Sequence, residues 1–307
     1  MRVLITGATG LIGGALNEYL RGKGAETISL VRKPPVNFDS SYIHWDPDAD
    51  TLDPRQLEHL DAVVHLAGEN IATGRWTAER KQRIFNSRIH GTALLCAALT
   101  ACAAPPKVVV SASAIGYYGD RGDAVLAETA GPGQGFLAET CLAWEAAARP
   151  LSDAGIRTIF LRTGMVLSPS GGALERMLLP FRMGAGGPIG LGQRWMSWIT
   201  LEDQVRLIAF CLDRESLSGP VNAVAPHPVK NGEFARALGR LLRRPALLPT
   251  PPLALRLAFG EMARELLLSS TRVVPKRLEE ALFVWRHPRI EEALRYSLAP
   301  LSKIVSA

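Results

Sequence analysis

The stretch RVLITGATGLIGG, residues 2–14, is an apolar run followed at once by glycines at every third position. The apolar run has the composition of a buried strand, and the residues after the second glycine have the apolar spacing of a helix. A turn between a strand and a helix lets backbone N–H groups approach a pyrophosphate, which the helix dipole also attracts. Glycines alone would indicate only a tight turn, but in this setting they predict a dinucleotide-binding site. The residues expected to hold the dinucleotide here are Thr6, Gly7, Gly10, Leu11, Ile12 and Gly13.

The first half of the chain continues this alternation of apolar strands and helices. We expect strands at residues 2–7, 27–32, 61–68, 107–113 and 157–167. We expect helices between them, at residues 11–24, 77–102 and 134–149. Continuously apolar strands that alternate with helices are typical of a parallel sheet covered on both faces. The predicted fold class is therefore α/β, with a Rossmann-type doubly wound parallel sheet.

The pattern changes near residue 165, where a second part of the chain begins. The later elements are a glycine-rich loop at 184–193, a short strand at 219–226 and helices at 201–214, 230–244 and 289–298. We expect residues 1–165 to form the NAD(P)-binding Rossmann domain, to which segments such as 195–224 return. Residues 166–307 are expected to form a smaller mixed substrate lobe with a proline-punctuated C-terminal extension.

The composition is that of an ordinary globular protein. The 35 Lys and Arg exceed the 29 Asp and Glu by only 6, and the densest basic cluster, GRLLRR at 239–244, is interrupted by leucines. This charge favours small anionic ligands, with nucleic acid as a weak alternative. No run of about 18 apolar residues occurs, so no membrane span is expected. Glycines and threonines interrupt the apolar N-terminus, which therefore does not resemble a signal peptide.

Four cysteines, at positions 96, 102, 141 and 211, lack the spacing of metal ligands, so no metal site is expected. Free thiols in apolar surroundings suit a reducing compartment, and we expect a cytoplasmic protein. Cys96 and Cys102, on the helix expected at 77–102, are interpreted as small core residues.

The end of the second strand indicates which dinucleotide is bound. An acidic residue there would bind the ribose 2′-hydroxyl, but the sequence has Val31, Arg32 and Lys33. An arginine suits a 2′-phosphate through its charge and its bidentate geometry. We therefore expect NADP, with NAD as the less favoured cofactor. The alternative is that Arg32 and Lys33 are solvated residues leading into the loop KPPVNF.

The stretch HLAGEN, residues 65–70, ends the strand expected at 61–68. Its small residues Ala67 and Gly68 would let the backbone lie against the adenosine ribose of the cofactor, and Leu66 is expected to contact the cofactor with them. His65 is a lone histidine in an apolar strand. We interpret it as a packed, hydrogen-bonded core residue rather than a catalyst.

TGATGLIG, HLAGEN, SASAIGYYG (111–119) and SWITLED (197–203) together resemble the extended short-chain dehydrogenase/reductase superfamily, in its nucleoside-diphosphate-sugar epimerase/dehydratase branch. RWTAERKQRI, GYYGDRGD, FLAETCLAWE and the tail from RRPALLPTPP onward resemble more narrowly its atypical "epimerase family protein" subgroup. The resemblance covers essentially the whole chain. Members of the wider superfamily use a catalytic serine followed by a Tyr-x-x-x-Lys motif, so the resemblance implies these residues. The lysine of the motif binds the nicotinamide ribose and lowers the pKa of the tyrosine.

The resemblance puts Ser113 in the place of the catalytic serine, with Ser111 and Ala112 beside the cofactor. It puts Leu137 and Cys141 in the places of the tyrosine and the lysine, so both functional groups are missing. An apolar leucine cannot exchange a proton. Cys141 is interpreted as a buried, inert thiol, the alternative being a thiolate in an electropositive pocket.

Two tyrosines that follow the serine strand, Tyr117 and Tyr118, are the candidate proton donors, because ligands bind at the carboxyl edge of such sheets. The alternative is that both are packing residues with solvated hydroxyls. Glu139 and Glu145 are expected to lie away from the pocket or to cap backbone groups.

Three basic residues could replace the charge of the missing lysine: Arg75, Lys81 and Arg88. One charge-assisted contact of this kind contributes roughly 1.5–3 kcal/mol. We expect Arg88 to contact the cofactor. The alternative for these residues is a charged solvent face on a long helix, and it is favoured slightly more for Lys81 than for Arg88.

The segment GAGGPIGLGQRWMSWI, residues 184–199, is expected to form a lid over the substrate, because it joins mobile glycines to Trp195, Met196 and Trp198. Gln193 and Arg194 could supply hydrogen bonds and a charge, and an arginine would suit the diphosphate of a nucleotide-sugar. The alternative, favoured for Trp198, is that the aromatic residues anchor the loop in the core.

Two functions follow from these patterns. The first is an NADP(H)-binding epimerase/dehydratase-like oxidoreductase that acts on a small carbonyl or nucleotide-sugar-like substrate without the usual tyrosine–lysine pair. The second, indicated by the missing tyrosine–lysine pair, is a catalytically degenerate, NADP(H)-sensing regulatory protein. The resemblance also implies a link to cell division, because relatives in the subgroup have been linked to organelle or cell division. By analogy with relatives, the helices at 77–102 and 136–149 could pair in a homodimer.

Overall fold

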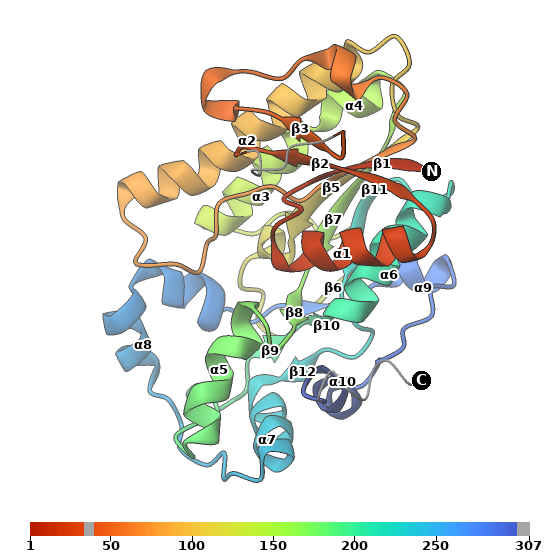
Figure 1. Cartoon of the computed structure of the whole chain (residues 1–307). Helices are drawn as coiled ribbons and strands as arrows, with labels where there is room; N and C mark the ends of the chain where they lie inside the picture. The colour runs from red at the N-terminus through yellow and green to blue at the C-terminus, as the bar shows by residue number, and fades with distance from the viewer. Residues whose placement is uncertain (34–39, 300–307) are drawn as a thin grey trace.

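The structure, a computed structural model, describes residues 1–33 and 40–299. Its centre is a sheet of seven parallel strands in the order β11-β7-β5-β4-β1-β2-β3 (Figure 1). The bounds are β1 Arg2–Thr6, β2 Glu26–Val31, β3 Tyr42–His44, β4 Ala62–His65, β5 Val108–Ala114, β7 Arg157–Thr163 and β11 Gly219–Ala223. From β1 the chain adds β2 and β3 on one side and the later strands on the other. This doubly wound sheet confirms the predicted fold class.

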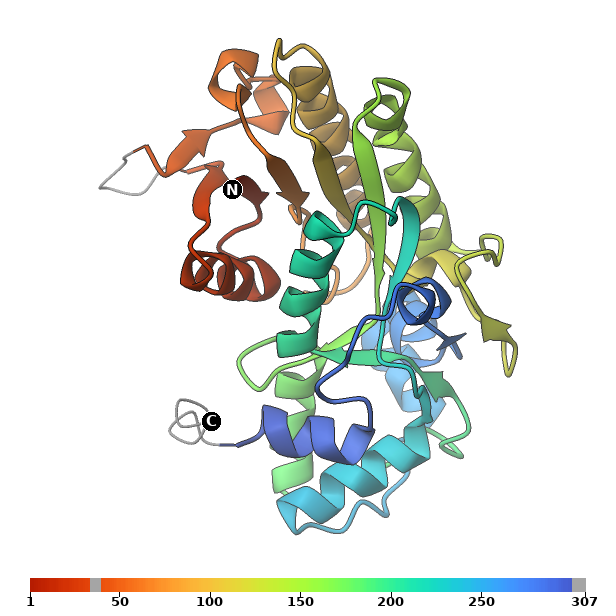
Figure 2. The same cartoon turned by 90° about the vertical axis from the view of Figure 1, so that its right-hand side faces the viewer.

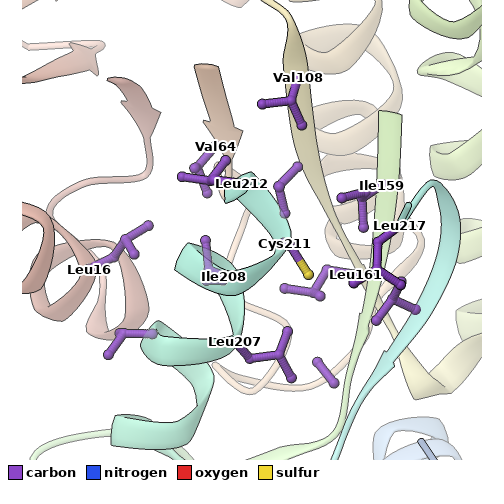
Figure 3. Packing of buried hydrophobic residues seen from close by; sticks show 14 of the residues in the cluster. Leu16, Val64, Val108, Ile159, Leu161, Leu207, Ile208, Cys211, Leu212 and Leu217 are labelled. Carbon is purple, nitrogen blue, oxygen red and sulfur yellow. The ribbon is translucent and has the colours of Figure 1, made fainter. Parts of the chain in front are cut away.

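Helices cover both faces of the sheet (Figure 1). One face is covered by α1 (Leu11–Gly22) and α6 (Leu201–Asp213), and the other by α2 (Ala78–Thr100), α3 (Phe136–Ala147) and α4 (Arg149–Asp153). Because successive strand residues point to opposite faces, Val3 and Leu4 of β1 belong to different core layers. Figure 3 shows the first layer, where Leu16 of α1, Val64 of β4 and Ile208 of α6 lie in one buried cluster.

The remaining elements lie mostly beyond the carboxyl ends of the strands, at the lower end of Figure 1. There, α5 (Gly172–Arg182), α7 (Asn231–Leu242) and α10 (Ile290–Ser297) pack around the fully buried Trp198, and Figure 2 shows α7 and α10 side by side. Three short strand pairs join this region: β8 (Met165–Leu167) with β10 (Trp198–Thr200), β9 (Trp195–Met196) with β12 (Val229–Lys230), and β6 (Val125–Leu126) with β13 (Arg272–Val273). The other elements are α8 (Pro252–Phe259), α9 (Lys276–Glu280), a π-helical turn η4 (Ala263–Leu267), and the 3-10 turns η1 (Pro47–Ala49), η2 (Pro54–Leu57) and η3 (Ile115–Tyr118).

Two local expectations from the sequence are corrected by the structure. The strand expected at 157–167 breaks at Gly164, after which β8 leaves the main sheet and pairs with β10. A Cβ on Gly164 would lie 2.7 Å from the carbonyl oxygen of Ser197, so the close approach of these two segments requires a glycine. The helix α5 was not expected, and Pro180 within it explains why, since proline is disfavoured inside helices.

The free cysteines Cys96, Cys102, Cys141 and Cys211 are all buried, which confirms the first two as core residues. Within the described residues, no helix has both the length and the apolar character needed to cross a membrane.

Candidate cofactor and active site

The carboxyl ends of β1 and β4 meet where the strand order reverses. These strands end side by side, with Thr6 opposite His65, and the loops that leave them lead to α1 and toward α2. In open α/β sheets, ligands bind in the crevice at such a reversal. The site is therefore built outward from these two loops.

The glycine turn after β1 is packed so closely that two of its glycines cannot be replaced without movement of the backbone. Gly7 has a φ of +68°, and a Cβ there would lie 2.9 Å from the carbonyl carbon of Leu66. A Cβ on Gly13 would lie 2.2 Å from the carbonyl oxygen of Gly7. The Gly10 N–H donates to the same Gly7 oxygen at 2.9 Å and closes the turn.

The helix that follows this turn keeps its positive end free. Within the described residues, no side chain caps Gly10, and the first turn of α1 contains no acidic residue. The unpaired N–H groups at the start of the helix, which includes Leu11 and Ile12, and the helix dipole therefore favour an anion at this position. The structure brings together all six residues that the sequence assigns to this turn.

A hydrogen-bonded chain holds the ends of β1 and β4 together. The Thr6 hydroxyl accepts from the Leu66 and Ala67 N–H groups at 3.0 and 2.9 Å, so its own proton goes to Nδ1 of His65 at 2.8 Å. The Nε2–H of His65 then donates to the Thr92 hydroxyl at 2.9 Å. Burial lowers the pKa of His65 to about 4, so the ring is neutral. This confirms His65 as a hydrogen-bonded core residue.

Arg88 of α2 lies against the HLAGEN stretch rather than on a solvent face. Its guanidinium carbon is 3.3 Å from the position that a Cβ on Gly68 would take, and it lies 5.0 Å from the centre of the Trp144 ring. Its Nη1 donates to the carbonyl oxygens of Ile84 and Glu69 at 3.0 and 3.1 Å. Burial lowers the pKa of Arg88, and its charge is close enough to Cys141 for the two groups to interact electrostatically.

The other two candidates for the lysine charge lie elsewhere. Lys81 forms an ion pair of 2.9 Å with Glu261, and the Arg75 guanidinium lies beside Gly260. Both therefore contact the C-terminal segment, and of the three basic residues Arg88 is the one that packs on Trp144 of α3.

Ser113 belongs to a buried network of charges. Its hydroxyl donates to Oε1 of Glu145 at 2.8 Å, and the same carboxylate accepts two bonds of 2.8 Å from Nε and Nη2 of Arg162. All three side chains are buried. Burial alone would lower the pKa of Arg162, but the hydrogen bonds and the negative charge of Glu145 raise it. Of the two expectations for Glu145, the capping of backbone groups is wrong, because its carboxylate binds the side chains of Ser113 and Arg162 instead.

The two candidate tyrosines differ sharply in their surroundings. Tyr118 is fully buried, donates to Oδ1 of Asn222 at 2.7 Å and accepts from Arg162 at 3.0 Å, and burial raises its pKa. The Tyr117 ring packs on the guanidinium of Arg162 at 3.5 Å and keeps 8% of its surface exposed. Among the described residues, no hydrogen-bond partner occupies the Tyr117 hydroxyl. Only Tyr117 therefore has a hydroxyl left for a ligand.

The positions of the missing tyrosine and lysine are filled by packing. Leu137 and Cys141 are buried, and a Cβ on Gly116 would come within 3.2 Å of the Leu137 Cβ. Burial raises the pKa of Cys141 to about 11, which agrees with an inert thiol. Neither of these two positions therefore offers a proton at neutral pH.

The remaining sequence candidates lie along the same edge of the sheet. The Ser111 hydroxyl is buried and has no hydrogen-bond partner among the described residues, while Ala112 is half-buried. Arg32 is exposed and borders a pocket of about 630 Å³ that Arg83 and His90 also line. The loop KPPVNF falls mainly on residues 34–39, outside the described ranges. Residues 1–33 and 40–299 hold no cluster of potential metal ligands.

The side chains expected to meet a substrate are engaged within the protein. Arg194 pairs with Asp120 at 3.4 Å, and the Trp195 indole donates to Asp123 at 2.6 Å. The side-chain amide oxygen Oε1 of Gln193 accepts from Nζ of Lys230 at 2.8 Å. Met196 is half-buried in a strand, and Trp198 is anchored in the core, as favoured from the sequence.

Sequence reasoning missed the partners in the buried network: Glu145, Arg162, Asn222 and Glu128. Glu128 accepts from the Asn222 N–H at 3.1 Å and so ties the network to β11. One signal was available, because Arg162 is a charged residue within the apolar part of β7, whose other charge, Arg157, stands at the first position of the strand. A buried charge needs a partner.

The comparisons with known proteins agree with this geometry. Residues 3–223 match the model of the NAD dependent epimerase/dehydratase family. The chain belongs to this family. Residues 250–296 also match a domain of unknown function, DUF1731, so the family domain carries a C-terminal extension.

Among members of the NAD dependent epimerase/dehydratase family, an epimerase family protein of Mycobacterium bovis is 45% identical over 295 residues, which cover 96% of this chain and 97% of that protein. The crystal structure of human epimerase family protein SDR39U1 with NADPH is similar, with a TM-score of 0.89, 35% identity and coverage of 96% and 98%. A nucleoside-diphosphate sugar epimerase structure from Corynebacterium glutamicum has a TM-score of 0.80 and 35% identity, over 97% of this chain and 58% of that one.

Proposed function

We propose that the protein is an NADP(H)-dependent oxidoreductase or epimerase-like enzyme that acts on a small carbonyl or nucleotide-sugar-like substrate. The observation that carries this proposal is the cradle at the β1–β4 reversal, where Gly7 and Gly13 leave room for backbone only and Arg88 lies across the crevice edge. Bound NADP(H) would exchange a hydride with the substrate. The protein's own groups would bind the dinucleotide, orient the substrate and move the proton.

The residues at this edge fit the parts of the cofactor. The free start of α1 suits the pyrophosphate, and the unpartnered Ser111 hydroxyl offers a hydrogen bond to a ligand. Arg32 lies directly after β2, where a 2′-phosphate would be bound, and it has no competing acid beside it in sequence. NADPH in the human relative supports the choice of NADP.

Arg88 is the residue that we propose supplies the positive charge of the missing lysine. It comes from α2 instead of α3, yet its guanidinium lies 5.0 Å from the centre of the Trp144 ring, three residues after Cys141 on α3. Its charge also interacts with Cys141, which takes the lysine's place in the family pattern. Within residues 1–33 and 40–299, Nη1 is the guanidinium nitrogen that binds protein carbonyls, so Nε and Nη2 can donate to a ribose.

Replacing Arg88 by methionine should weaken NADPH binding by about 10- to 150-fold, because one or more charge-assisted hydrogen bonds are lost. The matched control is Lys81→Met on the same helix, whose charge is already paired with Glu261 and which should change the affinity less than twofold. Both are measured by titrating NADPH and NADH against the purified chain. Equal affinities of the Arg88 variant and the wild type would remove Arg88 from the site.

For the chemistry, Ser113 is a positioning and binding group. Because its proton is donated to Glu145, it presents lone pairs and would accept a hydrogen bond from a substrate hydroxyl. Tyr117 would then give or take the proton. Tyr118 is assigned a structural role, since both neighbours of its hydroxyl are protein groups.

Replacing Tyr117 by phenylalanine should therefore reduce turnover by about 100- to 10,000-fold, the usual contribution of a general acid, with NADPH affinity unchanged. Tyr118→Phe serves as the control and should affect stability more than turnover. Activity is followed as loss of NADPH absorbance in a screen of carbonyl compounds and nucleotide-sugars. A Tyr117 variant with wild-type turnover would refute the assignment.

The burial of Leu137 and Cys141 favours a second candidate, an NADP(H)-sensing protein without turnover. NADPH binding with no turnover in that screen would support it, and clear turnover would exclude it. In either case we propose that residues 1–165, with segments such as 195–224, serve the cofactor and that the rest serves the substrate or partner. The four buried free thiols support a cytoplasmic location.

A further inference from the structure

The exposed apolar side chains of this protein are concentrated in one region. Of the thirteen large apolar side chains exposed among the described residues, eight come from the segments 179–191 and 247–259. We call these eight the apolar face. They are Leu179, Met183, Leu191, Leu247, Leu248, Leu253, Leu257 and Phe259.

The segments that carry the apolar face are joined to one another. The Thr250 N–H donates to the carbonyl oxygen of Pro188 at 2.8 Å, and the Gly190 N–H donates back to Thr250 at 3.0 Å. The Arg244 side chain binds the carbonyl oxygen of Arg182, at the end of α5, at 2.9 Å. Figure 1 shows α5 and α8 at the same end of the molecule.

The helix α8 is the most unusual part of the apolar face. None of its eight residues, PLALRLAF, is buried, and Arg256 is its only charged residue. A helix that is apolar all round is normally buried, and a helix this short has little stability of its own. A partner surface is needed to cover α8.

We propose that a second copy of this chain covers the apolar face in a symmetric dimer. Burial of a leucine side chain contributes about 1.5–3 kcal/mol, which corresponds to about 60–120 Å² of apolar surface removed from water. Eight partly exposed side chains of this kind therefore offer an apolar surface on the order of 600 Å². One side of a stable dimer buries about 800 Å², of which about 65% is apolar, so the two areas match. In such dimers the same patch meets itself across a two-fold axis.

The scarcity of charge within the apolar face is typical of an interface core. From Leu247 to Phe259 the chain carries one charge, Arg256, and interface cores are depleted of acids and lysines but enriched in arginine. The alternative face, formed by α2 and α3, is much poorer in apolar groups. Within those two helices, Leu142 is the only large apolar side chain that is exposed.

This proposal goes beyond the proposed function and does not depend on cofactor binding. It is tested on the full chain by sedimentation equilibrium over a range of micromolar concentrations. The wild type should be dimeric, and the double variant Leu253→Glu/Leu257→Glu should raise the dimer dissociation constant by at least about 100-fold. Leu142→Glu is the matched control on α3 and should leave the constant unchanged. Circular dichroism and thermal melting establish that each variant is folded.

Salt provides a second readout. Arg182, Arg243 and Arg244 are exposed at the edge of the apolar face, so two copies repel through these charges at low salt. The dimer should therefore become tighter as salt rises. A wild type that stays monomeric at every concentration would overturn the proposal. A dimer broken by Leu142→Glu but not by the double variant would overturn it as well, and so would salt-sensitive capture of the monomer by anionic vesicles.

Discussion

Replacing Glu145 by glutamine is expected to lower the free energy of unfolding by about 3–5 kcal/mol, because breaking a buried ion pair leaves a charge without a partner. The pair is buried on both sides, with Arg162 exposed by 3% and Glu145 by 9%. Two bonds of 2.8 Å join them, and a third from Ser113 completes the carboxylate. In a chain of this size the loss corresponds to a fall in melting temperature on the order of 10 °C.

Two comparisons make this prediction specific to the buried pair. The double variant Glu145→Met/Arg162→Met removes both charges and should be more stable than Glu145→Gln, because no lone charge remains. Glu291→Gln breaks the exposed pair with Arg240, at 3.4 Å, and should cost less than about 1 kcal/mol. Urea unfolding measures all three variants. If Glu145→Gln costs no more than Glu291→Gln, the buried network does not hold β5, β7 and α3 together as we infer.

The central sheet could be predicted because its signals are local. β1, β4 and β5 each contain three consecutive apolar residues, and α1, which follows the glycine turn, has apolar residues at helical spacing. The break at Gly164 could not be predicted, because it is imposed by contacts with Ser197 and Val224, which are distant in sequence. For α5, the proline inside the helix is a local signal that points the wrong way.

The candidate site shows the same division. The glycine turn is encoded within a few residues, whereas the partner of Ser113 lies 32 residues away in Glu145. Lys81 and Arg88 are two helical turns apart and face α3 together, over Phe136 at 5.2 Å and Trp144 at 5.0 Å. The two residues differ because Lys81 pairs with Glu261, which is 180 residues away in the sequence. The helical spacing of the sequence cannot reveal that contact.

Replacing Gly13 by alanine is expected to weaken NADPH binding by at least about 100-fold. The added Cβ would lie 2.2 Å from the carbonyl oxygen of Gly7, 2.8 Å from its carbonyl carbon and 2.9 Å from the Ala8 Cα. All three neighbours are backbone, so the turn must open. Overpacking costs about 1–3 kcal/mol, and each lost N–H contact to a phosphate costs roughly 1.5–3 kcal/mol more.

The neighbouring Gly14 provides a control that differs by one position. A Cβ on Gly14 would lie 3.6 Å from the Ala8 carbonyl oxygen, an ordinary contact. Gly14→Ala should therefore leave NADPH affinity unchanged and stabilise α1 by roughly 0.5–1 kcal/mol, the usual gain inside a helix. Thermal melting without cofactor separates the two effects, because a Gly13 variant that melts cooperatively but no longer binds has lost the cradle and not the fold. If such a folded variant still bound NADPH as tightly as Gly14→Ala, the turn after β1 could not be the pyrophosphate site.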